Sequence, residues 1–318
     1  MVLTETRKKI KSMEIRGAGR IARAAVEALA DHAESLDSSD INRFRKEMES
    51  AAESLVSTRP TAVSLPNAVH IVMDAMAGQD SVAGARMAIR KKANEFIGSS
   101  RDAVERIAQI GARHIRDGDT ILTHCNSEAA LSCIIEAARE GKDITVFATE
   151  VRPRNQGLAT IRVLNDAGIK TNFIVDSAVR SFINGVDLVI TGADAVAVNG
   201  AVVNKIGTSQ IALAAHEART SFLVAAETYK FAPRTILGEM IEIEERPAGE
   251  VLPDQIAKEL PQVTVRNPAF DVTPAEYIDL IVTEAGAIPP QMAYIIIRDY
   301  LHWEIQEFKY EFGMKHHD

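Results

Sequence analysis

The chain has 318 residues, of which 46% are hydrophobic, and its formal net charge is -8. Such a chain can bury a substantial core, and its length suits two domains better than one. The negative charge argues against general attraction to nucleic acid or to an anionic membrane surface, although a local group of Arg and Lys could still bind a small anion.

The chain contains two cysteines, Cys125 and Cys133, which lie eight residues apart. Two cysteines at this spacing do not make a disulfide framework, and the sequence shows neither a signal peptide nor a long apolar span. We therefore expect a cytoplasmic protein that has no membrane and no nucleic-acid partner.

The first third of the chain has the periodicity of helices. Apolar residues recur at helical spacing from Ile21 to about Ile97, and the charged segment before them is compatible with a helix. Asp and Ser residues at 37–40 are typical of a helix cap, and Pro60 disfavours a helical conformation at Arg59. These patterns predict an N-terminal helical domain over residues 1–100.

After a further helical stretch, Arg101 to Ile115, short β-branched runs alternate with helical patterns. The expected strands are Thr120–Thr123, Ile144–Ala148, Thr171–Val175, Leu188–Thr191, Ser221–Ala225 and Tyr277–Val282. This alternation predicts a mostly parallel sheet with right-handed crossovers. The expected fold class is α/β, with a Rossmann-like catalytic domain over residues 101–318.

Polar residues follow several of the predicted strands where these end. His124-Cys125-Asn126-Ser127 follows the first strand, Glu150 to Gly157 the second, Gly192-Ala193-Asp194 the fourth and Glu227 to Lys230 the fifth. A loop leads to Asn204-Lys205 before another helix. Ligands of open α/β sheets bind at the carboxyl ends of the strands, so we expect these residues to converge on one site.

Each of these residues also has a structural interpretation. Cys125 could be a structural thiol, Asp194 could cap a turn, and Asn204 with Lys205 could form a solvated loop. Cys133 lies inside an apolar helical pattern and is expected in the core. The functional interpretation is favoured because all the polar segments occupy the same edge of the predicted sheet.

Two segments of the helical domain could bind a phosphate. Arg16-Gly17-Ala18-Gly19-Arg20 opens a helix, and small residues there let backbone N–H groups approach an anion. Arg59 offers a planar cation to phosphate oxygens. The segment does not follow a strand and no Walker motif is present, so a nucleotide fingerprint is not indicated. No His-x-x-x-His pattern is present, and no metal is expected.

Six short segments stand out as a set: Arg16-Gly17-Ala18-Gly19, Arg59-Pro60-Thr61-Ala62-Val63, Cys125-Asn126-Ser127, Arg152-Pro153 with Gln156-Gly157, Gly192-Ala193-Asp194, and Asn204-Lys205-Ile206-Gly207-Thr208. Together they resemble a family of sugar-phosphate isomerases that includes archaeal ribose-1,5-bisphosphate isomerase and 5-methylthioribose-1-phosphate isomerase. Regulatory subunits of the eukaryotic initiation-factor exchange complex are relatives of this family. The motifs span residues 16–208, and the register continues through Phe270 to Pro274 and Ile288 to Pro290.

Within the family, the segment around Cys125 is most similar to the ribose-1,5-bisphosphate branch. The methylthioribose branch typically has Gly where this chain has Glu128, and Arg where this chain has Ala195. The methylthioribose reaction is one alternative function. A non-catalytic regulatory subunit of a translation-initiation exchange factor is another, although such subunits generally lack the Cys and Asp pair.

The resemblance implies an aldose-ketose isomerase that converts ribose 1,5-bisphosphate to ribulose 1,5-bisphosphate in archaeal AMP degradation. It implies that Cys125 accepts the proton and Asp194 donates one, that no cofactor is needed, and that the chain forms a homo-oligomer, either a dimer or a hexamer built from dimers. The implied substrate-binding residues are Arg16, Gly17, Ala18, Gly19, Arg59, Ser127, Glu128, Ala129, Arg152, Gln156, Asn204, Lys205 and Lys230.

This chemistry makes demands on two pKa values. Cys125 must be a thiolate to accept a proton, so we expect a thiol pKa below the value of about 8.5 of a free cysteine. Asp194 must be protonated to donate, so we expect a raised pKa. A bisphosphate also needs two anion sites, and we expect one in each domain, with the substrate held at both ends.

Overall fold

The computed structural model describes residues 2–12, 14–15, 17–59 and 62–301. The chain divides into two compact units, Met1–Ala103 and Val104–Asp318, which are described separately. Within the described ranges, no helix combines the length and the apolar character that crossing a membrane requires.

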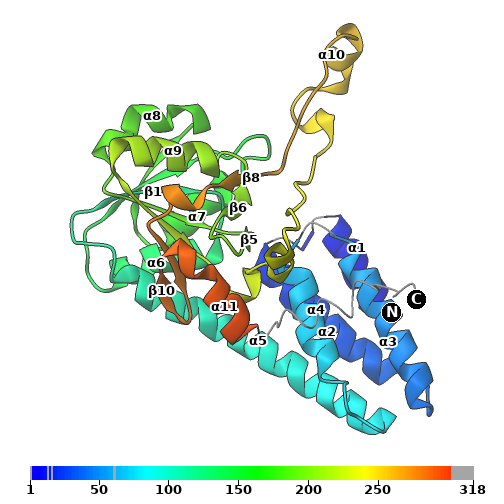
Figure 1. The fold of residues 1–318 in the computed structure, drawn as a ribbon. Helices are drawn as coiled ribbons and strands as arrows, with labels where there is room; N and C mark the ends of the chain where they lie inside the picture. The colour runs from blue at the N-terminus through cyan, green and yellow to red at the C-terminus, as the bar shows by residue number, and fades with distance from the viewer. Residues whose placement is uncertain (1, 13, 16, 60–61, 302–318) are drawn as a thin grey trace. The chain divides into compact units, whose positions relative to one another are not determined.

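The first unit is built from helices. They are α1 (Val2–Lys11), α2 (Ala18–Ser35), α3 (Ile41–Val56), α4 (Ser64–Asp74) and the first part of α5 (Val82–Ala112) (Figure 1). Asp40 begins α3, because its carboxylate accepts the backbone N–H groups of Asn42 and Arg43 at 2.7 and 2.9 Å, which confirms the predicted cap. Small apolar residues of α2 such as Ala22 and Ala25 are fully buried.

Helix α5 joins two stretches that the sequence analysis treated separately, the helical pattern that ends at about Ile97 and the further helical stretch Arg101 to Ile115. The helix is continuous there although Gly98, Ser99 and Ser100 are weak helix formers. The Ser99 hydroxyl donates to the Phe96 carbonyl of the preceding turn, and Ser100 is 2% exposed. Side-chain hydrogen bonds and burial therefore outweigh the local propensity.

The second unit contains a seven-stranded sheet in the order β10-β9-β7-β4-β1-β2-β3. The strands are β1 (Thr120–His124), β2 (Thr145–Thr149), β3 (Lys170–Ile174), β4 (Leu188–Gly192), β7 (Ser221–Ala225), β9 (Leu280–Thr283) and β10 (Gly286–Ile288). All neighbours are parallel except β9 and β10. The helices between them are α6 (Glu128–Arg139), α7 (Gly157–Asp166), α8 (Val179–Phe182) and α9 (Thr208–Ala218). The predicted α/β class with a helical N-terminal region and a mostly parallel sheet is confirmed.

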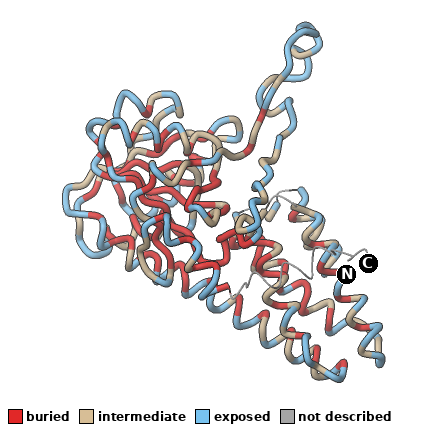
Figure 2. The backbone as a smooth tube through the Cα atoms, viewed as in Figure 1, coloured by how far each residue is buried: buried red, intermediate tan, exposed pale blue. Residues whose placement is uncertain are grey.

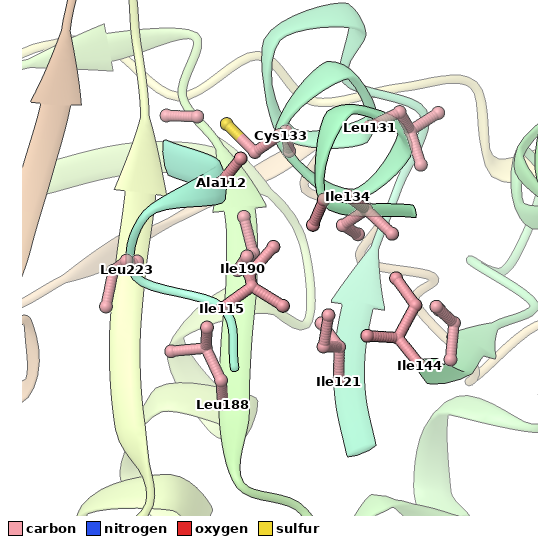
Figure 3. Close-up of a cluster of buried hydrophobic side chains, with 14 of the residues drawn as sticks. Ala112, Ile115, Ile121, Leu131, Cys133, Ile134, Ile144, Leu188, Ile190 and Leu223 are labelled. Carbon is pink, nitrogen blue, oxygen red and sulfur yellow. The ribbon is translucent and has the colours of Figure 1, made fainter. Parts of the chain in front are cut away.

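Both faces of the sheet are buried. On one face, a cluster of apolar side chains joins the end of α5 and helix α6 to the strands, with Ile134 above Ile121 and Ile190 (Figure 3). The alternate strand residues, such as Leu122 and Phe222, are also buried, and α9 packs against β4 and β7. Figure 2 shows this burial along the central strands. Burial on both sides explains why the strands are nearly continuous apolar runs.

Some of the sheet structure was not predicted. Three short strands, β5 (Ala195–Val196), β6 (Val202–Lys205) and β8 (Phe270–Thr273), form a separate antiparallel sheet. The start predicted for the last parallel strand, at Tyr277, was wrong, because Pro274 is followed by a 3-10 turn and β9 begins at Leu280. β5 has only two residues and pairs with the nearby β6, whereas the partner of β6 on its other side, β8, is about 70 residues away, so no local pattern reveals this sheet.

Two strands mark the point at which the order of the sheet reverses. From β1 the chain builds β2 and then β3 on one side, and it then returns to place β4 on the other side of β1. In sheets of this kind, ligands bind beyond the carboxyl ends of the two strands at such a switch point. These are the ends that lead to Cys125 and Asp194.

Candidate active site

Cys125 and Asp194 follow adjacent strands. His124, the last residue of β1, lies opposite Thr191 in β4; Cys125 directly follows β1, and Asp194 is the second residue after β4. Both side chains are half-buried. The carboxylate of Asp194 is close enough to Cys125 to affect the pKa of the thiol. The two residues that the sequence nominates for proton transfer therefore lie together at the switch point.

The backbone of Cys125 is held in an uncommon conformation. Its φ of 68° lies in the left-handed region, which non-glycine residues rarely adopt. The buried Thr160 hydroxyl on α7 donates to the Cys125 carbonyl at 2.8 Å, and the Cys125 Sγ lies 3.8 Å from Gln156 Oε1. Strained backbone held by specific bonds is typical of functional sites. Thr160 was not identified from the sequence, because a helical Thr has no distinguishing local signal.

The expectation of a lowered thiol pKa was wrong. The pKa of Cys125 is raised to about 11, chiefly by burial, and the carboxylates of Asp194 and Asp176 contribute in the same direction. The Lys205 ammonium is the largest influence in the opposite direction, and the backbone N–H of Asn126 adds to it. A cation that favours the thiolate is therefore present, but desolvation of the thiolate outweighs its effect on the pKa.

The N-terminus of α6 lies beside this pair. Ser127 is its N-cap, and the Ser127 hydroxyl accepts the Ala130 N–H at 3.3 Å. Glu128 is exposed in the first turn, whereas Ala129 is buried. A Cβ on Gly192 would lie 2.2 Å from Ser127 Oγ, so the glycine at the end of β4 is what allows the helix to approach.

Asn204 and Lys205 lie at the end of β6 and are fixed by local contacts. Asn204 is 5% exposed, and its Nδ2 donates to the Thr208 hydroxyl, which in turn donates to the Lys205 carbonyl. The Lys205 ammonium lies 4.5 Å from the centre of the Phe270 ring, a favourable cation-π geometry. Lys205 is thus positioned near Cys125 by both its backbone and its side chain.

Asp271 was not nominated, although it lies in the Phe270 to Pro274 segment of the resemblance. It faces Asn204 across β6 and β8, and its Oδ2 accepts the N–H groups of Gly207 and Ser209 at 2.8 and 3.1 Å. Its Oδ1 is buried and makes no hydrogen bond within the described part of the chain. Burial raises the pKa of this carboxyl to about 6. A carboxylate within an apolar β run was the signal that could have found it.

Lys230 is buried after β7. Its ammonium lies 2.6 Å from Glu227 Oε2, and Tyr229 donates to the other carboxylate oxygen at 2.9 Å. Although burial raises the pKa of Glu227, Lys230 leads the opposing influences, and the net pKa lies below its ordinary value. Glu284 accepts the N–H and hydroxyl of Thr228 in the same region. A phosphate at Lys230 would have to share this lysine with a buried carboxylate.

The loop after β2 is held by one carboxylate. Asp176 accepts the N–H groups of Val151 and Arg152 at 2.9 and 2.8 Å. The Arg152 residue is exposed, and Gln156 is half-buried against Cys125. Of these two nominated residues, Gln156 is therefore the one that the structure places at the thiol.

The remaining nominated residues belong to the first unit. Arg16 lies outside the described residues. Gly17 is the N-cap of α2 with a φ of 86°, which favours glycine, Ala18 begins the helix, and Gly19 is buried. Arg59 is half-buried three residues after α3 ends, and its N–H donates to the Val56 carbonyl. The predicted positions at a helix start and a helix end are confirmed.

Comparison with known proteins gives full-length relatives. The chain is 54% identical over 302 residues to the ribose 1,5-bisphosphate isomerase of Methanocaldococcus jannaschii, covering 95% of this chain and 96% of that protein. It is 54% identical over 315 residues to the ribose 1,5-bisphosphate isomerase of Archaeoglobus fulgidus, covering 99% and 98%.

A solved structure and a family model also match most of the chain. The crystal structure of the Pyrococcus horikoshii OT3 translation initiation factor eIF-2B matches with a TM-score of 0.77 and 33% identity, over 91% of this chain and 97% of that one. The model of the initiation factor 2 subunit family matches residues 14–290. This chain therefore belongs to the initiation factor 2 subunit family, within the part of it that contains sugar-phosphate isomerases.

Proposed function

We propose that this protein is a ribose-1,5-bisphosphate isomerase that produces ribulose 1,5-bisphosphate by acid and base catalysis. The observation that carries the proposal is the 54% identity, over nearly the whole chain, to two proteins of that name. The geometry supports it, because a thiol and a carboxyl lie at the switch point of the sheet, where such chemistry needs them.

The reaction needs two proton movements. Opening the ring breaks the bond between C1 and the ring oxygen, and Asp194 donates a proton to that oxygen. Cys125 removes the proton from C2, which leaves an enol phosphate between C1 and C2. Cys125 passes that proton to C1, the C2 hydroxyl gives its proton to Asp194, and C2 becomes the ketone. Substrate and product are isomers, so both groups are regenerated.

The raised thiol pKa sets a condition on this mechanism. With a pKa of about 11, the thiol is protonated at neutral pH. It can act as a base only after it loses its proton, and the Lys205 ammonium is the cation that favours the thiolate. We therefore assign Lys205 a role in stabilising the thiolate as well as in binding the substrate.

The remaining nominated residues are proposed to bind the substrate. The N-terminus of α6 at Ser127, Glu128 and Ala129 offers backbone N–H groups, and Asn204, Lys205 and Lys230 offer side-chain donors. We also propose that the substrate is bound by Arg16 to Gly19, by Arg59, and by Arg152 with Gln156. The physiological setting that we propose is AMP degradation.

A homo-oligomer, a dimer or a hexamer built from dimers, is also proposed. Sedimentation velocity over a range of concentrations measures this property, and the expected mass is two or six times that of one 34.6 kDa chain. A monomer at all concentrations would contradict it.

The function is tested by assaying the purified protein with the α-anomer of ribose 1,5-bisphosphate and, in parallel, with 5-methylthioribose 1-phosphate. Ribulose 1,5-bisphosphate formation is followed by ³¹P NMR. We expect the bisphosphate to be strongly preferred. The methylthioribose substrate would leave one phosphate site empty, and unpaired polar groups lose more transition-state binding energy than an unfilled apolar pocket does. Preference for the methylthioribose substrate, or no turnover of either, would overturn the proposal.

A further inference from the structure

His124 is a buried histidine that neither the resemblance nor the proposed mechanism uses. It ends β1 and directly precedes Cys125, and its side chain is completely buried. Its two ring nitrogens each have one close partner. Nδ1 lies 2.6 Å from the Thr149 hydroxyl at the end of β2, and Nε2 lies 2.9 Å from the Ile206 carbonyl.

These partners determine the tautomer. A carbonyl oxygen can only accept, so Nε2 carries the proton and donates to Ile206. Nδ1 is then the acceptor, and the Thr149 hydroxyl donates to it. Burial lowers the pKa of His124, which keeps the ring neutral, as this arrangement requires.

The bond from His124 reaches the turn that contains Lys205. Ile206 lies directly between Lys205 and Gly207, and a Cβ on Gly207 would lie 3.1 Å from Cε1 and Nε2 of the His124 ring. The turn therefore closes on the imidazole because residue 207, whose φ is 104°, is a glycine. The hydrogen bond and the close packing are two independent observations of the same contact.

The position of Lys205 matters for the thiol. The charged groups that act on Cys125 are Lys205 on β6, Asp194 after β4 and Asp176 beside the β2 loop. Both carboxylates disfavour the thiolate, and Lys205 is the charged group that opposes them. His124 itself faces Asp176, whose Oδ1 lies 4.0 Å from Nδ1, and Lys205.

We infer that His124 is a positioning residue: its neutral, buried imidazole binds the Lys205–Gly207 turn to the strand end that presents Cys125, and so holds the Lys205 ammonium beside the thiol. The inference rests on the proposed function, in which Cys125 acts as a base. A residue that serves only to fill the core would affect stability without affecting the thiol.

The test compares two substitutions of His124 that differ in reach. In His124→Gln, the side-chain amide can place an N–H close to the Nε2 position and keep the donor to Ile206. In His124→Asn, the shorter amide reaches only the Nδ1 position and loses that donor. Each is made in a Cys133→Ala background, so that Cys125 is the thiol that reacts.

The measurement is the rate of alkylation of Cys125 by iodoacetamide at pH 8 to 9.5, with no substrate present. At a pH below the thiol pKa, the alkylation rate is proportional to the fraction of Cys125 that is thiolate. A rise of about one unit in that pKa therefore slows alkylation about tenfold. We expect that slowing in His124→Asn and a rate near that of the parent in His124→Gln. Equal rates in all three proteins, or equal slowing in both variants, would overturn the inference.

This readout separates the inference from the proposed function, because alkylation needs no isomerase activity. If the protein turns over ribose 1,5-bisphosphate and the His124→Asn thiol is unchanged, the inference alone fails. If the thiol responds as expected and no pentose phosphate is turned over, the proposed function alone fails. With both correct, kcat falls about tenfold or more in His124→Asn and is restored in His124→Gln, while KM changes less.

A second measurement uses the unsubstituted protein and stands even where a variant does not fold. ¹⁵N NMR of the histidine side chains at pH 7 reports the tautomer and charge of each ring. We expect His124 to be neutral, with the proton on Nε2. A protonated ring, or a proton on Nδ1, would contradict the inference.

Discussion

The two cysteines of this chain show that neighbours decide what a thiol can do. Burial raises the pKa of both, Cys125 to about 11 and Cys133 to about 12. Cys133 donates to the carbonyls of Ile107 and Ala129 and packs against Gly111. Cys125 instead lies among charged groups: Asp194 raises the pKa of the thiol and Lys205 lowers it. Only Cys125 has partners that could take up or supply a proton.

We predict that Cys125→Ser and Asp194→Asn each fold and bind substrate but lose at least about two orders of magnitude in kcat, since a positioned proton-transfer group contributes about 10² to 10⁴ in rate. Steady-state kinetics with ribose 1,5-bisphosphate measure this loss. Cys133→Ala is the matched control, and its kcat should stay near that of the wild type. Near wild-type turnover by Cys125→Ser or Asp194→Asn would remove that residue from the mechanism.

Two helix starts bring backbone N–H groups to the edge of the sheet, and each depends on one residue outside its helix. Helix α6 approaches the end of β4 because Gly192 has no Cβ. Helix α9 begins where Asp271 on β8 accepts the N–H groups of Gly207 and Ser209. At this scale the fold controls the chemistry through contacts between elements that are distant in the sequence.

Gly192→Ala should separate α6 from β4, because the new Cβ would lie 2.2 Å from Ser127 Oγ and 2.5 Å from Ser127 Cβ. We expect a loss of about 1 to 3 kcal/mol in the free energy of unfolding, as for other overpacked sites, together with a lower kcat. Chemical denaturation and kinetics measure the two effects. Gly98→Ala on α5 has open space and should instead be neutral or stabilising by about 0.5 to 1 kcal/mol. Equal behaviour of the two variants would count against the steric explanation.

Asp271 makes the stability of the fold depend on pH. Its pKa of about 6 exceeds its ordinary value of 3.8, so between these values the folded state binds more protons than the unfolded state. The wild type should therefore lose stability relative to Asp271→Asn as the pH rises from 4 to 7, by about 1 to 2 kcal/mol. Urea denaturation of both proteins across this range tests it. A difference that stays constant with pH would show that the carboxyl titrates normally.

At the scale of the whole chain, two units contribute different chemistry. The second unit contains the proton-transfer pair together with Asn204, Lys205 and Lys230. The first unit contains small residues at the start of α2 and the half-buried Arg59 after α3. From the residue types of the first unit, we predict that Arg59 binds a phosphate group of the substrate.

Arg59→Ala should weaken binding of ribose 1,5-bisphosphate at least about tenfold, because a charged hydrogen bond to phosphate contributes about 1.5 to 3 kcal/mol. The comparison is Arg43→Ala, which removes an exposed cation that pairs with Glu47 one turn along α3. That variant should bind as the wild type does, since such surface pairs contribute little. Equilibrium binding to the Cys125→Ser protein separates binding from turnover. Wild-type affinity in Arg59→Ala would refute the phosphate role.

The sequence by itself determined most of the parallel strands, because the central ones are short apolar runs buried on both faces, and it determined that Cys125 and Asp194 follow strand ends. It also located the helix start at the small residues around Gly17 and the cap in the Asp and Ser residues at 37–40, whose signals are local. Only the tertiary structure decided the order of the strands, which makes β1 and β4 neighbours.

The tertiary structure also decided the electrostatics of the site. The need for a thiolate base led to a predicted thiol pKa below that of a free cysteine, whereas the pKa is raised to about 11, chiefly by burial. Burial depends on residues from many parts of the chain. The contacts of His124 likewise join it to Thr149 and Ile206, which are 25 and 82 positions away in the sequence. A pKa and a hydrogen bond depend on everything that surrounds a group in space, and no local pattern in the chain encodes those surroundings.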